Sequence, residues 1–270
     1  LQKTGGLFSA TKVWTPSTWH GESQMASSEE LWGLNTFDLF QVHNLVNWEG
    51  HLETLRQRKA EGRVRYIGIT TSHGMRHDEM AKVMREPDVD FIQLTYNAAD
   101  REAEQRLLPM AADNGVAVIA NRPFQRGALI DRVQRHPLPN WAADFGAENW
   151  SQVLLKFIIS HPAITCAIPA TSKVAHMTEN MGALSGPLPD AKQRARRKLV
   201  GYGPPDPVHA RRLYRHDRAL QRRGLARTSC GFCHDLGHHC LRTARRPNEC
   251  PDRFDNNSRV LDLGRLRLSY

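Results

Sequence analysis

The stretch DFIQLTYNAADREAEQRLLPMAADNGVAVIA, residues 90–120, contains one complete strand–helix–strand unit. Its two ends, 90–95 and 116–120, are short and strongly apolar, which is typical of strands that are buried on both faces of a sheet. The interval 101–113 carries apolar residues at helical spacing, and Asp100 is placed to cap the start of that helix. This order predicts two parallel strands joined by a right-handed crossover.

Four further runs of the same kind occur in the first two hundred residues. They lie at 7–13, 38–43, 64–69 and 164–168. Successive runs start about 25–30 residues apart, the length of one βαβ unit, and only the last interval is longer. The intervals include predicted helices at 50–61 and 150–158, and Asn149 is placed to cap the second of them.

Six strands that alternate with helices predict an α/β fold with a parallel sheet. Two architectures fit this pattern, a (β/α)8 barrel and an open doubly wound sheet. The open sheet normally binds a dinucleotide through a G-x-G-x-x-G sequence that follows a strand, and the chain contains no such sequence. The pattern therefore favours the barrel but leaves both architectures open.

Charge and cysteine content divide the chain near residue 200. Residues 1–200 carry 23 Lys and Arg against 21 Asp and Glu, whereas residues 201–270 carry 14 Arg, no Lys and 7 Asp and Glu. Cys166 is the one cysteine of the first part. We therefore predict a barrel domain in 1–200 and a basic tail in 201–270, which we expect to be disordered. A single cysteine in the first part fits a reducing compartment such as the cytoplasm.

The tail admits three interpretations. The sequence Cys230-x-x-Cys233-His234, with Cys240 nearby, offers ligands that zinc prefers, although a second well-spaced pair is missing. The many arginines could bind nucleic acid. Arg without Lys, mixed with His, Cys and Pro, is also the composition expected when a GC-rich gene is read out of frame, and we favour this interpretation.

The composition, 40% hydrophobic and 24% charged, is that of an ordinary globular protein. No apolar run reaches the roughly 18–20 residues that a membrane-spanning helix needs, and no basic-then-apolar leader is visible. Since the sequence starts at Leu1 rather than Met, it leaves open whether a leader precedes it.

Two ionisable residues lie where such barrels carry their functional groups, at the carboxyl ends of strands. Lys12 lies within the apolar run 7–13, and burying an unpaired ammonium group is costly. His43 ends the run 38–43. Each residue alone could be structural, Lys12 by extending to solvent and His43 as a hydrogen-bonded core residue. Because consecutive strand ends face one barrel mouth, the pair favours a functional site.

Six sequence blocks follow one another along these strands. They are ATKVW (10–14), DLFQVHN (38–44), RYIGIT (65–70), FIQLTYN (91–97), VAVIANRPF (116–124) and AIPATSK (167–173). In this order and spacing the chain resembles the aldo/keto reductase superfamily over roughly residues 7–185. The resemblance implies a (β/α)8 barrel that reduces aldehydes or ketones to alcohols with NADPH. The match lacks the first two βα units, so we expect an incomplete, open barrel whose edge strands are 7–13 and 164–168.

The resemblance also implies roles for single residues. Lys12 and His43 match the catalytic Lys and His, which assist protonation of the carbonyl oxygen. Trp14 and Trp48 are candidates for the wall of the substrate pocket. The residues that match cofactor contacts are Thr70, Thr71, Gln93, Asn121, Arg122, Phe124, Thr171, Ser172, Lys173, His176, Glu179 and Asn180.

Two departures from the family pattern affect the cofactor site. Asn121 stands where the family usually has an aromatic residue that stacks on the nicotinamide. His176 stands where the family often has an Arg near the 2′-phosphate, so NADH remains possible beside NADPH. Lys173 and the start of its helix still favour a phosphate group.

The family's proton donor, a Tyr, and the Asp that pairs with its Lys have no counterpart in this sequence, since Tyr66 and Tyr96 lie within predicted strands. We therefore expect at most residual carbonyl reduction. The alternative function is a catalytically impaired fragment, or a non-catalytic remnant with weak cofactor binding. The expected partner is a small carbonyl compound rather than a membrane or a nucleic acid.

The histidines suggest a rival site of another class. His43 and His73 follow strand ends, and His51 and His77 lie nearby, as in some metal-dependent (β/α)8 hydrolases. Such a site needs carboxylates and histidines at several strand ends, whereas the first strand offers only Lys12 and the last none. We therefore predict no resident metal.

Overall fold

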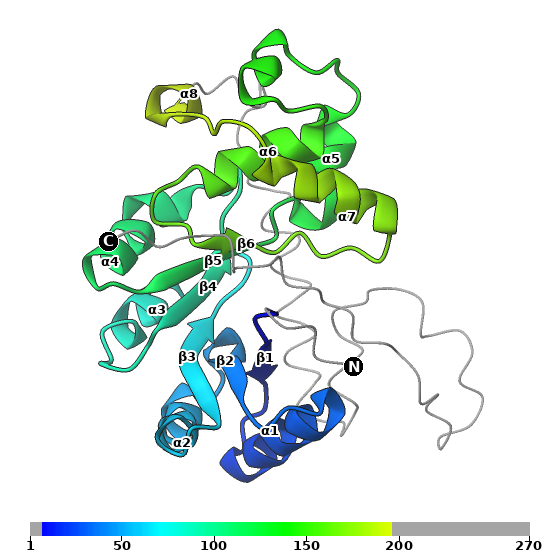
Figure 1. Ribbon diagram of the computed structural model, residues 1–270. Helices are drawn as coiled ribbons and strands as arrows, with labels where there is room; N and C mark the ends of the chain where they lie inside the picture. Colours follow the sequence, from blue (N-terminus) through cyan, green and yellow to red (C-terminus); the bar gives the residue numbers. More distant parts are fainter. Residues whose placement is uncertain (1–6, 196–270) are drawn as a thin grey trace, which may run out of the picture. The chain divides into compact units, whose positions relative to one another are not determined.

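The structure, a computed structural model of the chain, describes residues 7–195 (Figure 1). The predictions for residues 201–270, with their zinc, nucleic-acid and reading-frame interpretations, lie outside these residues. Within 7–195, no helix is both long enough and apolar enough to cross a membrane.

Six parallel strands form one sheet, and their order in the sheet is their order in the chain. The strands are β1 (Ala10–Val13), β2 (Phe37–Val42), β3 (Val64–Thr70), β4 (Phe91–Thr95), β5 (Ala117–Asn121) and β6 (Cys166–Ala167). Among the described residues, β1 and β6 are therefore the two edges of the sheet. This confirms the predicted parallel sheet of an incomplete (β/α)8 barrel, with the first and last predicted strands at its edges.

Helices connect the strands and pack on one face of the sheet (Figure 1). The α-helices are α1 (Thr18–Trp32), α2 (Trp48–Ala60), α3 (His77–Val83), α4 (Leu107–Asp113), α5 (Ala128–Val133), α6 (Trp150–Ile159), α7 (Val174–Met181) and α8 (Ala191–Ala195). Short 3-10 helices are η1 (His43–Leu45), η2 (Glu102–Gln105), η3 (Gln125–Gly127), η4 (Asn140–Phe145) and η5 (Gly182–Leu184). Strand residues such as Phe40 and Ile67 are fully buried in one apolar core with helix residues such as Leu52 and Leu108. The main core thus lies between the sheet and its helices, as a parallel sheet requires.

The opposite face carries a smaller apolar cluster. Leu39, Phe91, Ile119 and Cys166 are buried there, one from each of four strands and each among the first three residues of its strand. Burial raises the pKa of the Cys166 thiol to about 12, so this thiol stays protonated at neutral pH. The apolar side chains thus fill the inner face near the amino ends and leave the carboxyl ends to polar residues.

Carboxylates fix the amino ends of the strands. Asp38 of β2 accepts hydrogen bonds from the backbone N–H and the hydroxyl of Ser9, at 2.7 and 2.9 Å, and from Arg65 at 2.7 Å. Burial raises the pKa of the Asp38 carboxyl, but the bonds from Ser9 and Arg65 outweigh burial and hold the pKa below its usual value. Asp90, before β4, similarly accepts the backbone N–H of Ile67 at 2.8 Å. Both carboxylates therefore help to set the register of neighbouring strands.

The predicted helix over 101–113 is wrong in its first half. The segment forms η2 and α4, with a break at Arg106 (φ −143°), instead of one helix capped by Asp100. Pro109 explains the break. Inside a longer helix its ring would collide with the carbonyl four residues earlier, and proline has no backbone N–H to donate to that carbonyl. Starting α4 at Leu107 places the proline in the first turn, where it is tolerated.

The other predicted elements differ only at their bounds. Helix α2 starts two residues before the predicted 50–61, and α6 is capped as predicted, with the side chain of Asn149 accepting the N–H of Gln152 at 3.0 Å. The predicted last strand, 164–168, is reduced to two residues in β6. Backbone hydrogen bonds to β5 continue on either side of those two residues.

Candidate functional site

The first two strands bring the predicted catalytic residues to neighbouring strand ends. Lys12 is the register partner of Gln41, and His43 follows Gln41 by two residues, so their side chains share one face of the sheet. The imidazole of His43 packs against the indole of Trp14, with ring centroids 5.3 Å apart and planes inclined by 40°. Lys12, Trp14 and His43 therefore all lie near the carboxyl ends of β1 and β2, with Trp14 and His43 in contact.

The sequence prediction omitted Gln41, which lies beneath these residues. Its side chain is 1% exposed, and its Nε2 has no hydrogen-bond partner within residues 7–195. Leaving a buried amide group unpaired costs about 1–3 kcal/mol, so such groups are few in folded proteins. The available signal was alternation along the strand, which places Gln41 on the face of His43.

Trp48, the second predicted wall residue, lies elsewhere. It begins α2 and packs against the apolar core between the sheet and the helices. The ammonium group of Lys82 lies 5.8 Å from its ring centroid. Trp48 thus belongs to the helix layer, whereas Trp14 stands at a strand end beside His43.

A hydrogen-bond network joins the ends of β3, β4 and β5. Thr70 and Gln93 are register partners, and the N–H of Thr71 donates to the carbonyl of Gln93 at 2.8 Å. The side chain of Asn121 accepts from the hydroxyl of Thr95 at 2.7 Å and donates to the carbonyl of Thr71 at 2.9 Å. The four predicted residues at these strand ends, Thr70, Thr71, Gln93 and Asn121, are thus brought together. Thr95, which the sequence prediction omitted, completes the network.

The hydroxyls of the threonine pair have protein partners. The Thr70 hydroxyl accepts the backbone N–H of Asn44 at 3.0 Å, and the Thr71 hydroxyl donates to the sulfur of Met80 at 3.8 Å. Because a hydroxyl can donate as well as accept, the buried Thr70 hydroxyl can also donate one hydrogen bond. Thr71 instead joins the network through its backbone, whose N–H bonds Gln93 and whose carbonyl bonds Asn121.

Left-handed backbone gathers at this same end of the sheet. Eight non-glycine residues within 7–195 have positive φ: Asn44, Leu45 and Asn47 after β2, His73 and Arg76 after β3, and Arg122, Gln125 and Arg126 after β5. Such conformations cost about 1–3 kcal/mol each and persist at binding loops and active sites. Their position therefore indicates that the carboxyl end of the sheet is its functional end.

Arg122 is held at both its backbone and its side chain. Its guanidinium donates to Nε2 of His73, whose Nδ1 lies 2.8 Å from the hydroxyl of Ser72. Its carbonyl accepts the side chain of Asn97 at 3.0 Å. Phe124, two residues on, is half-buried and packs against the core. An arginine fixed in this way presents a positive charge suited to a phosphate group.

Most of the remaining predicted cofactor residues surround the start of α7. The hydroxyl of Thr171 accepts the backbone N–H of Lys173 at 3.1 Å. Ser172 and Lys173 are exposed, as are His176 and Glu179 on the helix itself. An exposed helix start beside Lys and His can hold a phosphate group.

Asn180 differs from these residues because its side chain is buried. Its amide donates to the carbonyl of Pro169 at 3.4 Å and so ties α7 to the segment that follows β6. The structure therefore gives Asn180 a protein partner at the place where the sequence predicted an adenine contact.

The four histidines of the rival metal site have separate partners. His43 contacts an indole, His73 a guanidinium, His51 the carbonyl of Thr15 and His77 the carboxylate of a glutamate. Within residues 7–195, no three His, Cys, Asp or Glu side chains lie close enough together to hold a metal ion.

The two tyrosines of the described residues have structural surroundings. Tyr66 packs with Phe8 and Phe91, at centroid distances of 6.3 and 5.6 Å, on the inner face of the sheet. The hydroxyl of Tyr96 donates to Glu104 at 2.6 Å, and burial together with this bond raises its pKa. Neither hydroxyl is placed beside His43.

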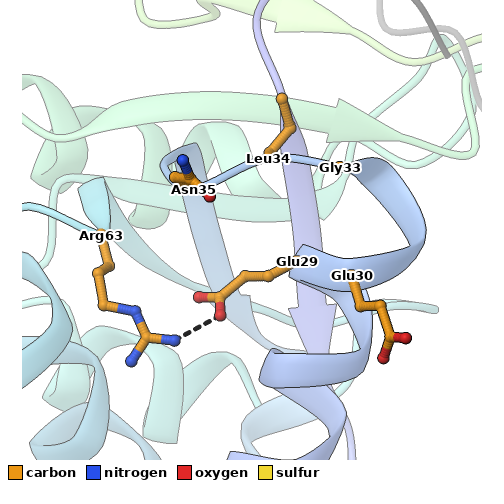
Figure 2. A pocket seen from close by; sticks show the side chains of 6 residues that line it. All are labelled: Glu29, Glu30, Gly33, Leu34, Asn35 and Arg63. Atoms are coloured by element: carbon orange, nitrogen blue, oxygen red, sulfur yellow. Dashed lines mark hydrogen bonds and ion pairs between the residues drawn. The ribbon is translucent and has the colours of Figure 1, made fainter.

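A pocket of about 510 Å³ lies at the other end of the sheet (Figure 2). It is lined by Glu29, Glu30, Gly33, Leu34, Asn35 and Arg63, where α1 ends and β3 is about to begin. Glu29 binds the guanidinium groups of both Arg58 and Arg63. Paired charges at the amino ends of barrel strands stabilise the fold, so this pocket is not the candidate site.

Comparison with known proteins identifies the family of the chain. The model of the aldo/keto reductase family matches residues 6–199. The NADH-specific methylglyoxal reductase of Escherichia coli K12 is 23% identical over 212 residues, which are 66% of this chain and 63% of that protein. Pyridoxine 4-dehydrogenase of the same organism is 27% identical over 195 residues, 68% of this chain and 65% of that protein. The chain thus spans slightly less than two thirds of these curated relatives.

A solved structure supports the fold. The aldo/keto reductase of Klebsiella pneumoniae in complex with NADP and acetate aligns with a TM-score of 0.60 and 24% identity, over 74% of this chain and 71% of that chain. The family match contains all six strands and every predicted site residue from Lys12 to Asn180.

Proposed function

Because the chain belongs to the aldo/keto reductase family, we propose that the carboxyl end of its sheet binds a nicotinamide dinucleotide and reduces a small aldehyde or ketone to an alcohol. The observation that carries the proposal is the position of Lys12, Trp14 and His43 at two neighbouring strand ends, with the indole of Trp14 against His43. The Klebsiella relative was solved with NADP, whereas an E. coli relative is NADH-specific. NADPH is therefore the expected cofactor and NADH the alternative.

The side chains at this end fit such a cofactor. Thr70 and Gln93 offer a hydroxyl and an amide across one ladder, which suits the carboxamide of nicotinamide. Arg122 and Lys173 supply positive charge for the phosphates. Asn121 is bonded to two strand ends and cannot stack as an aromatic would, so we expect weak binding.

The catalytic step requires a proton donor beside the carbonyl oxygen. When bound, the reduced nicotinamide supplies a hydride to the carbonyl carbon. His43 donates a hydrogen bond or a proton to the oxygen, and Lys12 stabilises the negative charge that develops there. Neither Tyr66 nor Tyr96 is placed to donate, and a missing general acid typically costs about 10²–10⁴-fold in rate. We therefore expect low turnover from the polypeptide 1–270.

Cofactor binding is tested by titrating the 270-residue chain with NADPH and following nicotinamide fluorescence. We expect a Kd on the order of 0.1 mM or weaker, which corresponds to about −5.5 kcal/mol. Lys173→Ala should weaken binding, whereas Lys192→Ala, which removes an exposed lysine of α8, should not. Equal effects of the two substitutions would contradict the predicted phosphate contact.

Catalysis is tested by NADPH oxidation with small aldehydes. Trace activity that is lost in both Lys12→Met and His43→Ala supports the proposal. Cofactor binding without any turnover supports the alternative, a non-catalytic remnant. Turnover that survives both substitutions would show that the reaction does not use this strand end.

A reducing compartment is the cellular location that we propose. Cys166 is the only cysteine among residues 7–195, and a barrel without disulfides suits a reducing compartment. We accordingly place the proposed activity in the cytoplasm, and fractionation of cells that produce the tagged chain would test this.

A further inference from the structure

Trp14 stands just beyond the end of β1, on the loop that leads into α1. Its side chain is 39% exposed and its indole lies against His43. A residue past the last strand position has no ladder partner to set its direction. The bonds that hold its backbone therefore decide where the indole points.

A single side chain of α1 holds the backbone of Trp14. The Oε1 of Gln24 accepts the Trp14 N–H at 2.8 Å, and the Nε2 of Gln24 donates to the Trp14 carbonyl at 3.1 Å. A neighbouring strand would satisfy the same two groups. Gln24 thus replaces a strand partner for the backbone of Trp14. It thereby fixes the direction in which the indole leaves the backbone.

A side chain of α2 holds the next residue. The Nε2 of His51 donates to the carbonyl of Thr15 at 2.7 Å, and the His51 ring is fully buried. The two helices approach closely at this point, because a Cβ on Gly21 would lie 2.4 Å from Cε1 of that ring. The loop is therefore fixed from α1 on one side and from α2 on the other.

We infer that Gln24 and His51 are positioning residues that hold the indole of Trp14 against His43 and so set the width of the carbonyl pocket. Because a pocket beside His43 belongs to the proposed function, this assignment rests on that proposal. The two bonds give an exposed glutamine of a mostly polar helix one specific partner, the backbone of Trp14.

The first test measures the contact itself, without activity. In the histidine-labelled 270-residue chain, the ring protons of His43, assigned with His43→Gln, should be shifted by the indole, and Trp14→Ala should remove that shift. Gln24→Ala should remove most of it, whereas Ser23→Ala, at the exposed neighbouring position, should leave it intact. Gln24→Ala should also fold, because Ala favours the helix.

The second residue has a conservative rescue. His51→Ala should release the loop, whereas the amide of His51→Gln can still donate to the Thr15 carbonyl and should retain more of the shift. If His51→Ala does not fold, the comparison of Gln24→Ala with Ser23→Ala decides alone. An unchanged His43 shift in folded Gln24→Ala would overturn the assignment.

A kinetic test separates this assignment from the proposed function. Gln24→Ala should raise KM for a small aldehyde by about three- to tenfold, because the released indole no longer holds the width of the pocket, and leave kcat nearly unchanged. If Gln24→Ala loses the His43 ring-proton shift but the parent chain reduces no carbonyl compound, the positioning role stands and the proposed function is wrong. Normal KM and a normal shift in an active Gln24→Ala chain remove the positioning role and leave the function.

Discussion

Replacing Gly21 by Ala tests the contact between α1 and α2. Gly21 is buried, and a Cβ built on it lies 2.4 Å from Cε1 and 2.7 Å from Nδ1 of His51. The same Cβ would lie 3.2 Å from a methyl group of Val13. The imidazole must therefore move, and its hydrogen bond to the carbonyl of Thr15 must stretch or break.

Three effects set the size of the change. Overpacking a buried site costs about 1–3 kcal/mol, and loss of a buried hydrogen bond costs a further 1–3 kcal/mol or so. The gain in helix propensity from Gly to Ala returns at most about 1 kcal/mol. We therefore expect Gly21→Ala to lower the free energy of unfolding by about 1–5 kcal/mol.

Urea unfolding followed by circular dichroism measures this difference. Ser27→Ala, at an exposed position of the same helix, is the control and should change stability by less than about 0.5 kcal/mol. In the double variant Gly21→Ala/His51→Ala, the added methyl group no longer meets an imidazole. A double-mutant cycle should therefore show that the second substitution offsets part of the cost of the first.

A Gly21→Ala chain as stable as the parent would refute the described approach of the two helices. An additive double-mutant cycle would likewise show that the methyl group and the imidazole do not meet. Either result would also weaken the role assigned to His51, since that role depends on the same contact.

Three further predictions concern the fold. Asp38→Asn should lower the free energy of unfolding by about 1–2 kcal/mol at pH 7, because it weakens the bond from Arg65. The folded pKa of Asp38 is lowered, so the difference between parent and variant in urea unfolding should be full above about pH 4. It should shrink as the pH falls through the folded pKa. Gly68→Ala should destabilise the sheet by more than about 2 kcal/mol in the same assay, because its Cβ would lie 2.5 Å from the backbone oxygen of Phe91, which cannot move aside. Cys166 should remain unalkylated by iodoacetamide at pH 8 in peptide mapping until urea is added, and labelling of the folded chain would contradict the burial of this thiol.

The strands were predictable because their signal is local. A parallel strand buried on both faces is a short apolar run, and each of the six runs overlaps one strand. Their carboxyl ends therefore predicted one common location for Lys12, His43, Thr70 and Gln93. The sequence could not show which of these side chains contact one another, because strand register is a property of pairs.

Helix α1 was not predicted because it lacks an apolar face. Only Gly21 and Met25 of its fifteen residues are buried, so no period of 3.6 residues is visible. The sequence does contain a residue typical of a helix start, Ser17, and one typical of a helix end, the left-handed Gly33. It has no periodic apolar pattern between them. Gln24 was not predicted as a positioning residue for the same reason, since nothing in the sequence indicates which residue a polar side chain on a polar helix contacts.

The split of 101–113 shows the opposite error, in which periodicity outweighed a local restriction. The apolar spacing was real, and Leu107, Leu108 and Ala111 of α4 are buried as expected. Pro109 nevertheless decided where the regular helix begins. A proline within a predicted helix therefore carries more weight than the apolar spacing on either side of it.

Because each strand lies beside the strand that precedes it in the chain, most strand pairings close only one βα unit. Such pairings close faster than pairings between strands that are distant in the chain, and they suit a chain that emerges from the ribosome one unit at a time. We expect nascent chains stalled after β3, β4 and β5 to gain protease resistance step by step, as each strand covers the edge left by the last. A pause in translation would leave the newest strand with unpaired N–H and C=O groups, and this is where a chaperone would bind the growing sheet.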